Sequence, residues 1–222
     1  MIIVITGTNT DVGKTIATAA LVSKLSRGGR TVVPVKPVQT GEPAGQGDAS
    51  TVERLTGVTG LDHLRFPEPL APNLSARRAG IPQPVLAEVV DWIRGLDGDD
   101  RVVLVEGAGG LLVRLADDWT LADLARELDA PLVVVTSTGL GSLNLAELTV
   151  EAAMRRGLRV LGLIGGSLPD EPDLATRLNL AEFPVVTGIP LLGCLPEGSG
   201  CLGQQDFAVV ADTLDLEPLA LA

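Results

Sequence analysis

The sequence is poor in the residues that build metal centres and disulfide frameworks. It contains one histidine, His63, and two cysteines, Cys194 and Cys201, which do not form a Cys-x-x-Cys pattern. A structural zinc ion takes four ligands, mostly from Cys and His, and this chain offers too few in any usual spacing. Two isolated cysteines also exclude a framework of several disulfides.

Positive charge and long apolar runs are scarce as well. The 17 basic residues against 28 acidic ones give a net charge of −11, which is unfavourable for binding to phosphate backbones or anionic lipids. The longest uncharged run, residues 130–146, is interrupted by glycines and hydroxyl residues and falls short of the ~20 apolar residues of a membrane-spanning helix. The apolar N-terminus lacks the basic segment of a signal peptide. We therefore expect a cytoplasmic protein that binds neither nucleic acid nor membrane.

What the sequence does contain is a series of short apolar runs in a chain of 222 residues, a length that predicts one domain over residues 1–222. The runs are rich in Val and Ile and do not alternate with polar residues, which is typical of strands buried on both faces of a parallel sheet. They cover residues 2–6, 31–35, 102–105, 132–135, 160–164 and 189–192. Helical patterns between them, such as 14–25 and 143–156, predict a doubly wound α/β fold with helices on both faces of a mostly parallel sheet. Ligands should then gather at the carboxyl ends of the strands.

Two segments rich in Pro and Gly lack a strand pattern. They are residues 37–47 and residues 66–84, and the second contains a possible short helix at 72–79. We interpret both as candidate active-site loops. The glycines of the first segment favour a loop that becomes ordered when ligand binds.

The first strand-to-helix turn carries a phosphate-binding signature. Residues 7–15 read GTNTDVGKT, directly after a predicted strand and before a predicted helix. Backbone N–H groups around Gly13 can hold phosphate oxygens, Lys14 can neutralise the β- and γ-phosphates, and the Thr15 hydroxyl can bind Mg²⁺. Five residues separate Gly7 from Gly13, one more than in the usual P-loop. The context still favours a nucleotide site over a turn that merely caps a helix.

Charged residues follow two further strands. Glu106 comes after an apolar run and before a glycine-rich segment, which makes it a candidate Mg²⁺ ligand at a strand end. Lys36 ends the second predicted strand and should point to the same sheet edge, where it would meet a phosphate or a substrate anion. Asp48 either caps a helix or is a further ligand of Mg²⁺, and its spacing alone slightly favours the cap.

A second glycine-rich turn, residues 138–144, also follows a buried strand and opens a helix. Free N–H groups at such a helix start can receive an anion. A plain turn without a ligand explains the spacing equally well.

Taken together, these segments resemble the dethiobiotin synthetase family. The resemblance rests on residues 7–15, on Lys36-Pro37-Val38-x-Thr40-Gly41, on residues 105–110 (VEGAGG) and on Gly139-x-Gly141-x-x-Asn144, in this order over most of the chain. It implies a homodimer of seven-stranded parallel sheets of the P-loop NTPase type. It also implies the reaction of 7,8-diaminopelargonic acid, CO₂ or bicarbonate, and ATP to dethiobiotin, ADP and phosphate, with Mg²⁺.

The resemblance further implies a role for individual residues. Lys36, Lys14 and Thr10 would be catalytic, with the two lysines on the γ-phosphate and the carbamate. Thr10, Asp11 and Thr40 would line the carbamate and the diamine, and Ser142 and Asn144 of the neighbouring subunit would receive the substrate carboxylate. Mg²⁺ would lie on Thr15, Asp48 and Glu106. The residues implied in ATP binding are Asp11, Val12, Gly13, Lys14, Thr15, Ile16, Asp48, Glu106, Gly107, Ala108, Gly109, Gly166, Ser167, Pro196, Glu197 and Gly198.

The chain departs from the family in one place. Family members often carry Asn-Asp after the strand at 160–164, where this chain has Gly165-Gly166-Ser167. A side-chain amide for the adenine edge is therefore missing. Recognition of the base would fall to backbone near Gly166 and in the segment 196–198, so we expect triphosphates other than ATP to be accepted with little penalty.

Two other functions fit the sequence less well. A partitioning or septum-placement ATPase normally has a lysine near the start of the loop, where this chain has Thr8 and Asn9, and it would use a basic amphipathic tail that is absent after Phe207. Another amide-forming ATP ligase of the superfamily, such as a cobyrinic acid diamide synthase, would need a glutaminase domain. Such a domain does not fit in 222 residues.

Overall fold

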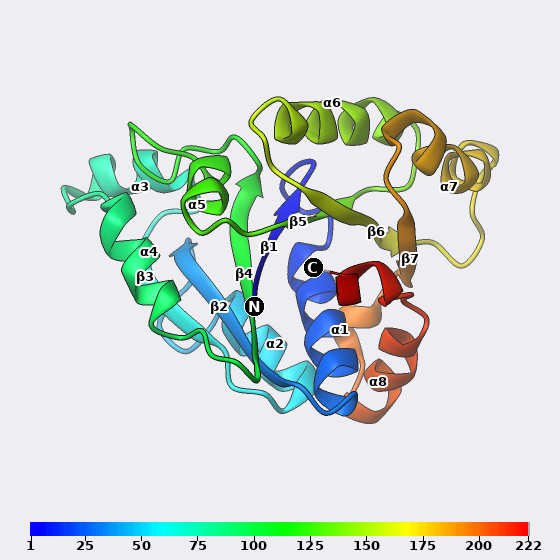
Figure 1. Ribbon diagram of the computed structural model, residues 1–222, viewed down its shortest axis with the longest axis horizontal. Helices are drawn as coiled ribbons and strands as arrows, with labels where there is room; N and C mark the ends of the chain where they lie inside the picture. The colour runs from blue at the N-terminus through cyan, green and yellow to red at the C-terminus, as the bar shows by residue number, and fades with distance from the viewer. Residues whose placement is uncertain (222) are drawn as a thin grey trace.

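The computed structural model describes residues 1–221 and contains a seven-stranded sheet in which every pairing is parallel (Figure 1). The order across the sheet is β3-β2-β4-β1-β5-β6-β7, with β1 at the centre. The seven parallel strands confirm the expected sheet. The strands are β1 (Ile2–Gly7), β2 (Thr31–Thr40), β3 (Leu61–Phe66), β4 (Arg101–Gly110), β5 (Leu132–Thr136), β6 (Val160–Leu168) and β7 (Leu191–Pro196).

Helices cover both faces of this sheet, as the sequence pattern predicts (Figure 1). One face carries α1 (Lys14–Arg27), α2 (Asp48–Thr56) and α8 (Gln204–Asp212), which pack on one another and share one apolar core. The other face carries α4 (Leu86–Arg94), α5 (Leu121–Glu127), α6 (Ser142–Met154) and α7 (Leu174–Thr187), with α3 (Pro72–Ala79) near its edge. Two short 3₁₀ helices lie at Ser199–Cys201 and Glu217–Leu221.

The central strand shows why the apolar runs do not alternate. In β1, Ile3 and Ile5 enter the core beneath α1, whereas Val4 between them enters the core on the opposite face. All three side chains are fully buried. Since successive side chains of a strand point to opposite faces, a strand covered on both sides must be apolar at every position.

Several strands are longer than the apolar runs that predict them. β2 continues to Thr40 because its first half pairs with β4 and its second half pairs with β3. The sequence pattern missed β3, an edge strand that carries Asp62, His63 and Arg65. The loop expected at residues 37–47 therefore starts only at Gly41, and Lys36 lies inside a strand instead of at its end. β4 and β6 likewise continue through their glycines.

Local helix signals agree with the structure in most places. α1 starts at Lys14 and α3 spans residues 72–79, as predicted. Thr120 caps α5 in a reciprocal arrangement, in which Asp123 N donates to Thr120 Oγ1 and Thr120 N donates to Asp123 Oδ2. β7 begins two residues later than expected, after Pro190. No helix within residues 1–221 has the length and apolarity needed to cross a membrane.

Candidate active site

The loop between β1 and α1 wraps around the side chain of Lys14. Lys14 is 7% exposed, and its Nζ donates to the Asn9 carbonyl oxygen at 3.1 Å. The loop contains two residues with positive φ, Asp11 at 58° and Gly13 at 92°. Gly13 leads directly into α1, so the positive end of the helix and a lysine lie together. This geometry is that of a phosphate-binding loop, as predicted.

The same loop lies directly on the end of β6. A Cβ atom on Gly166 would lie 1.8 Å from the Val12 carbonyl oxygen, and one on Gly13 would lie 2.5 Å from the Gly166 carbonyl oxygen. Only glycine allows two backbones to approach so closely. Gly166 therefore allows the backbone of β6 to pack directly against the phosphate-binding loop.

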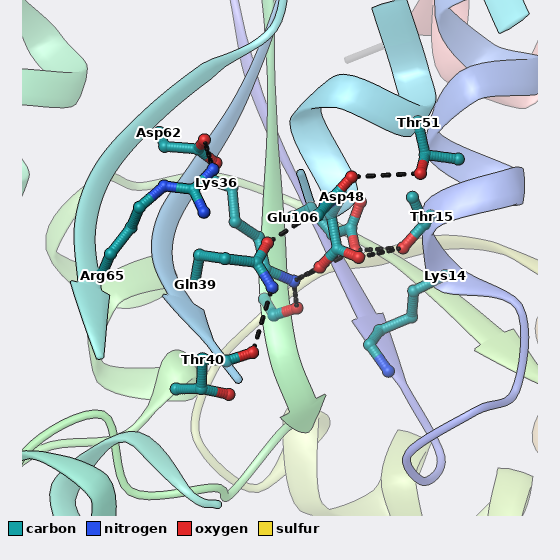
Figure 2. A network of polar contacts seen from close by, with 12 residues as sticks. Lys14, Thr15, Lys36, Gln39, Thr40, Asp48, Thr51, Asp62, Arg65 and Glu106 are labelled. Atoms are coloured by element: carbon teal, nitrogen blue, oxygen red, sulfur yellow. Dashed lines mark hydrogen bonds and ion pairs between the residues drawn. The ribbon is translucent and has the colours of Figure 1, made fainter. Parts of the chain in front are cut away.

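Lys36 forms the centre of a buried ionic cluster. Its Nζ lies 2.5 Å from Asp48 Oδ2 and 3.1 Å from Glu106 Oε1, and it donates to the Gly107 carbonyl oxygen at 2.8 Å. The Lys36 side chain is 4% exposed and that of Glu106 is 3% exposed. Lys36 lies inside β2 and not at its end. Its amine nevertheless lies with Asp48 and Glu106 on the side of the phosphate-binding loop, as expected (Figure 2).

Thr15 joins this cluster from the first turn of α1. Its hydroxyl lies 3.0 Å from Asp48 Oδ1 and 2.8 Å from Glu106 Oε1 (Figure 2). The three residues expected to hold Mg²⁺ thus come together from α1, α2 and β4. They present a hydroxyl and two carboxylates, the hard oxygen donors that Mg²⁺ takes in nucleotide sites, so this donor set fits the ion.

The structure decides between the two interpretations of Asp48. Gly47, not Asp48, is the N-cap residue of α2, and Asp48 is the first residue of the helix. The Asp48 carboxylate contacts Lys36 and Thr15 and caps no backbone N–H, so the cap interpretation is wrong. Its own N–H donates to Gln39 Oε1 at 3.1 Å, a contact that the sequence analysis missed.

Burial and charge act in opposite directions within the cluster. Burial lowers the pKa of Lys36, but the charges of Glu106 and Asp48 outweigh this and raise the pKa above its ordinary value. Burial raises the pKa of Glu106, and the nearby Lys36 only partly opposes it. Burial also raises the pKa of Asp48, but the Lys36 charge and hydrogen bonds outweigh this, so that the pKa of Asp48 lies below its ordinary value. Burial, followed by the Lys36 charge, lowers the pKa of Lys14.

The residues expected around the carbamate and diamine are exposed or half-buried. Thr10 and Asp11 are exposed on the loop. A Cβ atom on Gly109 would lie 3.6 Å from Thr10 Oγ1, so the glycine-rich end of β4 runs past the loop. Ala108 and Gly109 are half-buried there, and Thr40 is half-buried at the end of β2.

Residues expected on the base side of a nucleotide are also brought together. Glu197 N donates to the Leu168 carbonyl oxygen at 2.8 Å, which joins the segment after β7 to the end of β6, where Ser167 lies. A Cβ atom on Gly200 would lie 3.0 Å from Ile16 Cδ1. The segment after β7 thus lies against the end of β6 at Glu197 and against α1 at Gly200, although these segments are distant in sequence.

Ser142 was expected to receive the substrate carboxylate, but its hydroxyl is directed into the turn before α6. Ser142 is 1% exposed, its hydroxyl donates to the Gly139 carbonyl oxygen at 2.6 Å, and it lies 3.2 Å from Asn179 Nδ2. Asn144 is exposed, as a ligand contact requires. Within residues 1–221, no hydrogen bond links this turn to the Lys36 cluster.

Asn179 on α7 was missed by the sequence analysis. Its amide also donates to the Thr138 and Gly139 carbonyl oxygens, at 3.0 and 2.8 Å. A single Asn within a helical pattern carries no signal for such a role, since most helical asparagines lie at the surface.

Comparisons with known proteins identify the relatives of the chain. A family model described as an AAA domain matches residues 2–204. The chain is 66% identical over 215 residues to the ATP-dependent dethiobiotin synthetase BioD of Corynebacterium diphtheriae, covering 97% of both proteins. It is 53% identical over 215 residues to the protein of the same name from Rhodococcus jostii, covering 96% of this chain and 93% of that protein.

Solved structures show the same fold at low identity. A complex of a Cyanothece McdA variant with ATP matches with a TM-score of 0.60 and 15% identity, over 99% of this chain and 96% of that one. The septum site-determining protein MinD with Mg-ADP from Pyrococcus horikoshii matches with a TM-score of 0.56 and 21% identity, over 99% and 98%. These likenesses establish a P-loop NTPase type of fold. The high identity over nearly the full length of the curated relatives establishes more: this chain belongs to the ATP-dependent dethiobiotin synthetase family.

Proposed function

We propose that this protein makes dethiobiotin from 7,8-diaminopelargonic acid, CO₂ and ATP, and that Lys36 is its central catalytic residue. The observation that carries the proposal is the position of the Lys36 amine, which bridges Asp48 and Glu106 beside Thr15 at the phosphate-binding loop. The family membership supports the overall reaction. We infer in addition the roles of individual residues, a Mg²⁺ ion in the site and a homodimer.

The reaction has three steps whose atoms balance. One amine of the substrate attacks CO₂ and loses a proton, which gives a carbamate. A carbamate oxygen then takes the γ-phosphoryl group of ATP, and ADP leaves. The second amine attacks the carbamate carbon, inorganic phosphate leaves with both electrons of the C–O bond, and the ureido ring closes with loss of a proton.

The central difficulty of this reaction is the accumulation of negative charge. A triphosphate and a carbamate must approach each other, and charge spreads over the phosphoryl oxygens in the transition state. Lys14 would neutralise the β- and γ-phosphates. Lys36, whose pKa is raised by Glu106 and Asp48 despite burial, keeps its positive charge for the γ-phosphate and the carbamate.

Mg²⁺ would be held by Thr15, Asp48 and Glu106 and would supply charge neutralisation at the phosphates. The low pKa of Asp48 supports this role, because the carboxylate stays ionised at neutral pH. A direct test measures the Mg²⁺ concentration needed for ADP binding. We expect Asp48→Asn and Thr15→Val to raise it, whereas Thr59→Val, at an exposed threonine outside the site, should leave it unchanged.

Thr10, Asp11 and Thr40 would contact the diamine and the carbamate, with Asp11 as the negative charge near the two amines. In a homodimer, Asn144 and the first turn of α6 would receive the substrate carboxylate from the neighbouring subunit. The buried Ser142 hydroxyl would act by shaping that turn.

The ATP requirement and two cysteines that form no disulfide support a cytoplasmic location.

The nucleotide would lie along the segments that the fold assembles around α1. The β4 segment Glu106 to Gly109 and the loop from Asp11 to Ile16 would contact its phosphates. Backbone of Gly166 and Ser167, and of Pro196, Glu197 and Gly198, would face the base.

Phosphate release tests the function directly. We expect release from ATP, with Mg²⁺ and bicarbonate, to depend on diaminopelargonic acid in the wild type and to collapse in Lys36→Ala. Lys24→Ala is the matched control, because that lysine lies in the last turn of α1, at the opposite end of the helix from the phosphate-binding loop, and donates to carbonyl oxygens at the end of α8. Release that does not depend on the diamine, or that responds to DNA or lipid instead, would contradict the proposal.

A further inference from the structure

The loop that joins β2 to α2, residues 41–47, connects two parts of the site. Thr40 precedes it at the end of β2, and Asp48 follows it at the start of α2. Residues 43–46 are exposed and have no regular secondary structure. The path of this loop therefore decides whether the Asp48 carboxylate reaches Lys36 and Thr15.

Arg65, on the edge strand β3, holds this loop through three of its carbonyl groups. Its Nη1 donates to the carbonyl oxygens of Glu42 and Pro43 at 3.3 and 2.9 Å, and its Nη2 donates to that of Gln46 at 2.9 Å. A guanidinium group is planar and has several fixed donors, so one arginine can bind three carbonyls that a lysine amine could not reach together.

Asp62 in turn holds the guanidinium. Its Oδ2 accepts from Arg65 Nη2, and the side chains of Asp62 and Arg65 are only 19% and 25% exposed. Figure 2 shows the pair side by side on β3, next to the strand that carries Lys36. A partly buried ion pair with a fixed geometry loses less to solvent screening than an exposed one.

The inner end of the loop has a separate anchor. Gln39 Oε1 accepts from Asp48 N, and a Cβ atom on Gly47 would lie 2.8 Å from the same Gln39 oxygen. Gly47 has a φ of 111°, so the chain turns sharply there into α2. Gln39 therefore fixes the first residue of the helix, whereas Arg65 fixes the exposed part of the loop before it.

We propose that Arg65, oriented by Asp62, is a positioning residue that keeps the 41–47 loop in the arrangement in which Asp48 meets Lys36 and Thr15. The proposal rests on the proposed role of Asp48 in the Mg·ATP site. Under this proposal a side chain from the neighbouring strand holds the loop before ligand binds, whereas the glycines of the loop by themselves favour ordering on binding.

This role predicts a specific kinetic signature. Without Arg65, only a fraction of the enzyme has the ordered loop, and the apparent affinity for Mg·ATP falls by that fraction. Saturating nucleotide restores the ordered state. We therefore expect KM for Mg·ATP to rise about tenfold in Arg65→Ala, the size expected when hydrogen bonds to a charged group are lost, with kcat changed far less. Arg65→Lys should rescue only part of this loss.

Backbone amide exchange gives a second readout that does not depend on activity. We expect exchange in residues 41–48 to speed up about tenfold in Arg65→Ala, with the core strands unchanged. Asp62→Asn, which removes only the charge that orients Arg65, should give a smaller change in the same direction. Arg27→Gln is the matched control, because that arginine also binds a carboxylate and a carbonyl, those of Asp212 and Ala208, at the surface.

Unchanged exchange in residues 41–48, or faster exchange with an unchanged KM for Mg·ATP, would overturn the proposal. Faster exchange throughout the sheet would also overturn it, since Arg65 would then serve global stability. Failure of the proposed function is distinguishable: the wild type would show no diamine-dependent phosphate release, whatever the exchange data show.

Discussion

Lys36 and Glu106 form an ion pair inside the protein, with Nζ 3.1 Å from Oε1 and both side chains at most 4% exposed. They lie on two adjacent strands of the sheet, β2 and β4, and are 70 residues apart in sequence. Removing two charges from water is costly, and the pair is tolerable because Gly107, Asp48 and Thr15 supply further polar contacts. These contacts hold the ionisable groups of the site together.

This pair leads to a prediction about stability. Lys36→Met leaves Glu106 buried without its partner and should lower the free energy of unfolding by about 3 kcal/mol, as does the loss of one member of other buried pairs. Glu106→Gln should also destabilise the protein. The double variant should lose clearly less than the sum of the two, because neither charge then remains buried alone. Urea denaturation of all four proteins measures this, and strictly additive losses would contradict it.

Lys14 should make nucleotide affinity depend on pH. Its pKa lies below the ordinary value of 10.5 because of burial and the neighbouring Lys36 charge. As the pH rises, Lys14 therefore loses its proton earlier than an ordinary lysine does, and the positive charge that attracts the phosphates disappears. Affinity for ADP should fall with rising pH on the alkaline side, and binding there should take up protons.

Isothermal titration calorimetry in buffers of different ionisation enthalpy measures both quantities for Lys14. In Lys14→Arg the charge persists over the whole range, so the remaining affinity should lose this alkaline decline. An equally steep decline in Lys14→Arg would assign the effect to another group.

Gly166 should be sensitive to the smallest possible substitution. A methyl group in Gly166→Ala would lie 1.8 Å from the Val12 carbonyl oxygen, so the phosphate-binding loop must move. We expect ADP affinity to fall by about tenfold or more, as a displaced loop loses one or more phosphate contacts made by backbone N–H groups. Gly95→Ala is the control, since its new Cβ would meet its nearest neighbours at 3.4 Å. Equal ADP affinity in both variants would show that the contact with β6 does not matter for the loop.

The same contact bears on base selectivity. Because Gly166 faces the loop and has no side chain, it offers no amide to an adenine edge. We expect CTP and GTP to replace ATP with little penalty. Competition of each nucleotide against ATP in diamine-dependent turnover measures this preference, and strong rejection of CTP and GTP would contradict the expectation.

Much of the fold follows from local patterns. The apolar runs predicted six of the seven strands, since a strand buried on both faces must be apolar throughout. β3 was not predicted because it lies at the edge of the sheet and contains the polar residues Asp62, His63 and Arg65, so it has no continuous apolar run. The predicted ends of β2, β4 and β6 were too early, because the pairing of neighbouring strands, and not apolarity, decides where a strand stops.

For the site, the sequence by itself determined the chemical groups: the GTNTDVGKT loop, Lys36, Glu106 and the glycines near them, which together were enough to identify the family. Only the tertiary structure decided how these groups are used. Whether Asp48 caps a helix or joins the ionic cluster depends on Lys36 and Thr15, which lie 12 and 33 residues away. Likewise, Arg65 and Asn179 gain their roles from backbone carbonyls of distant loops. Such contacts depend on three-dimensional proximity, which a local pattern of residues does not encode.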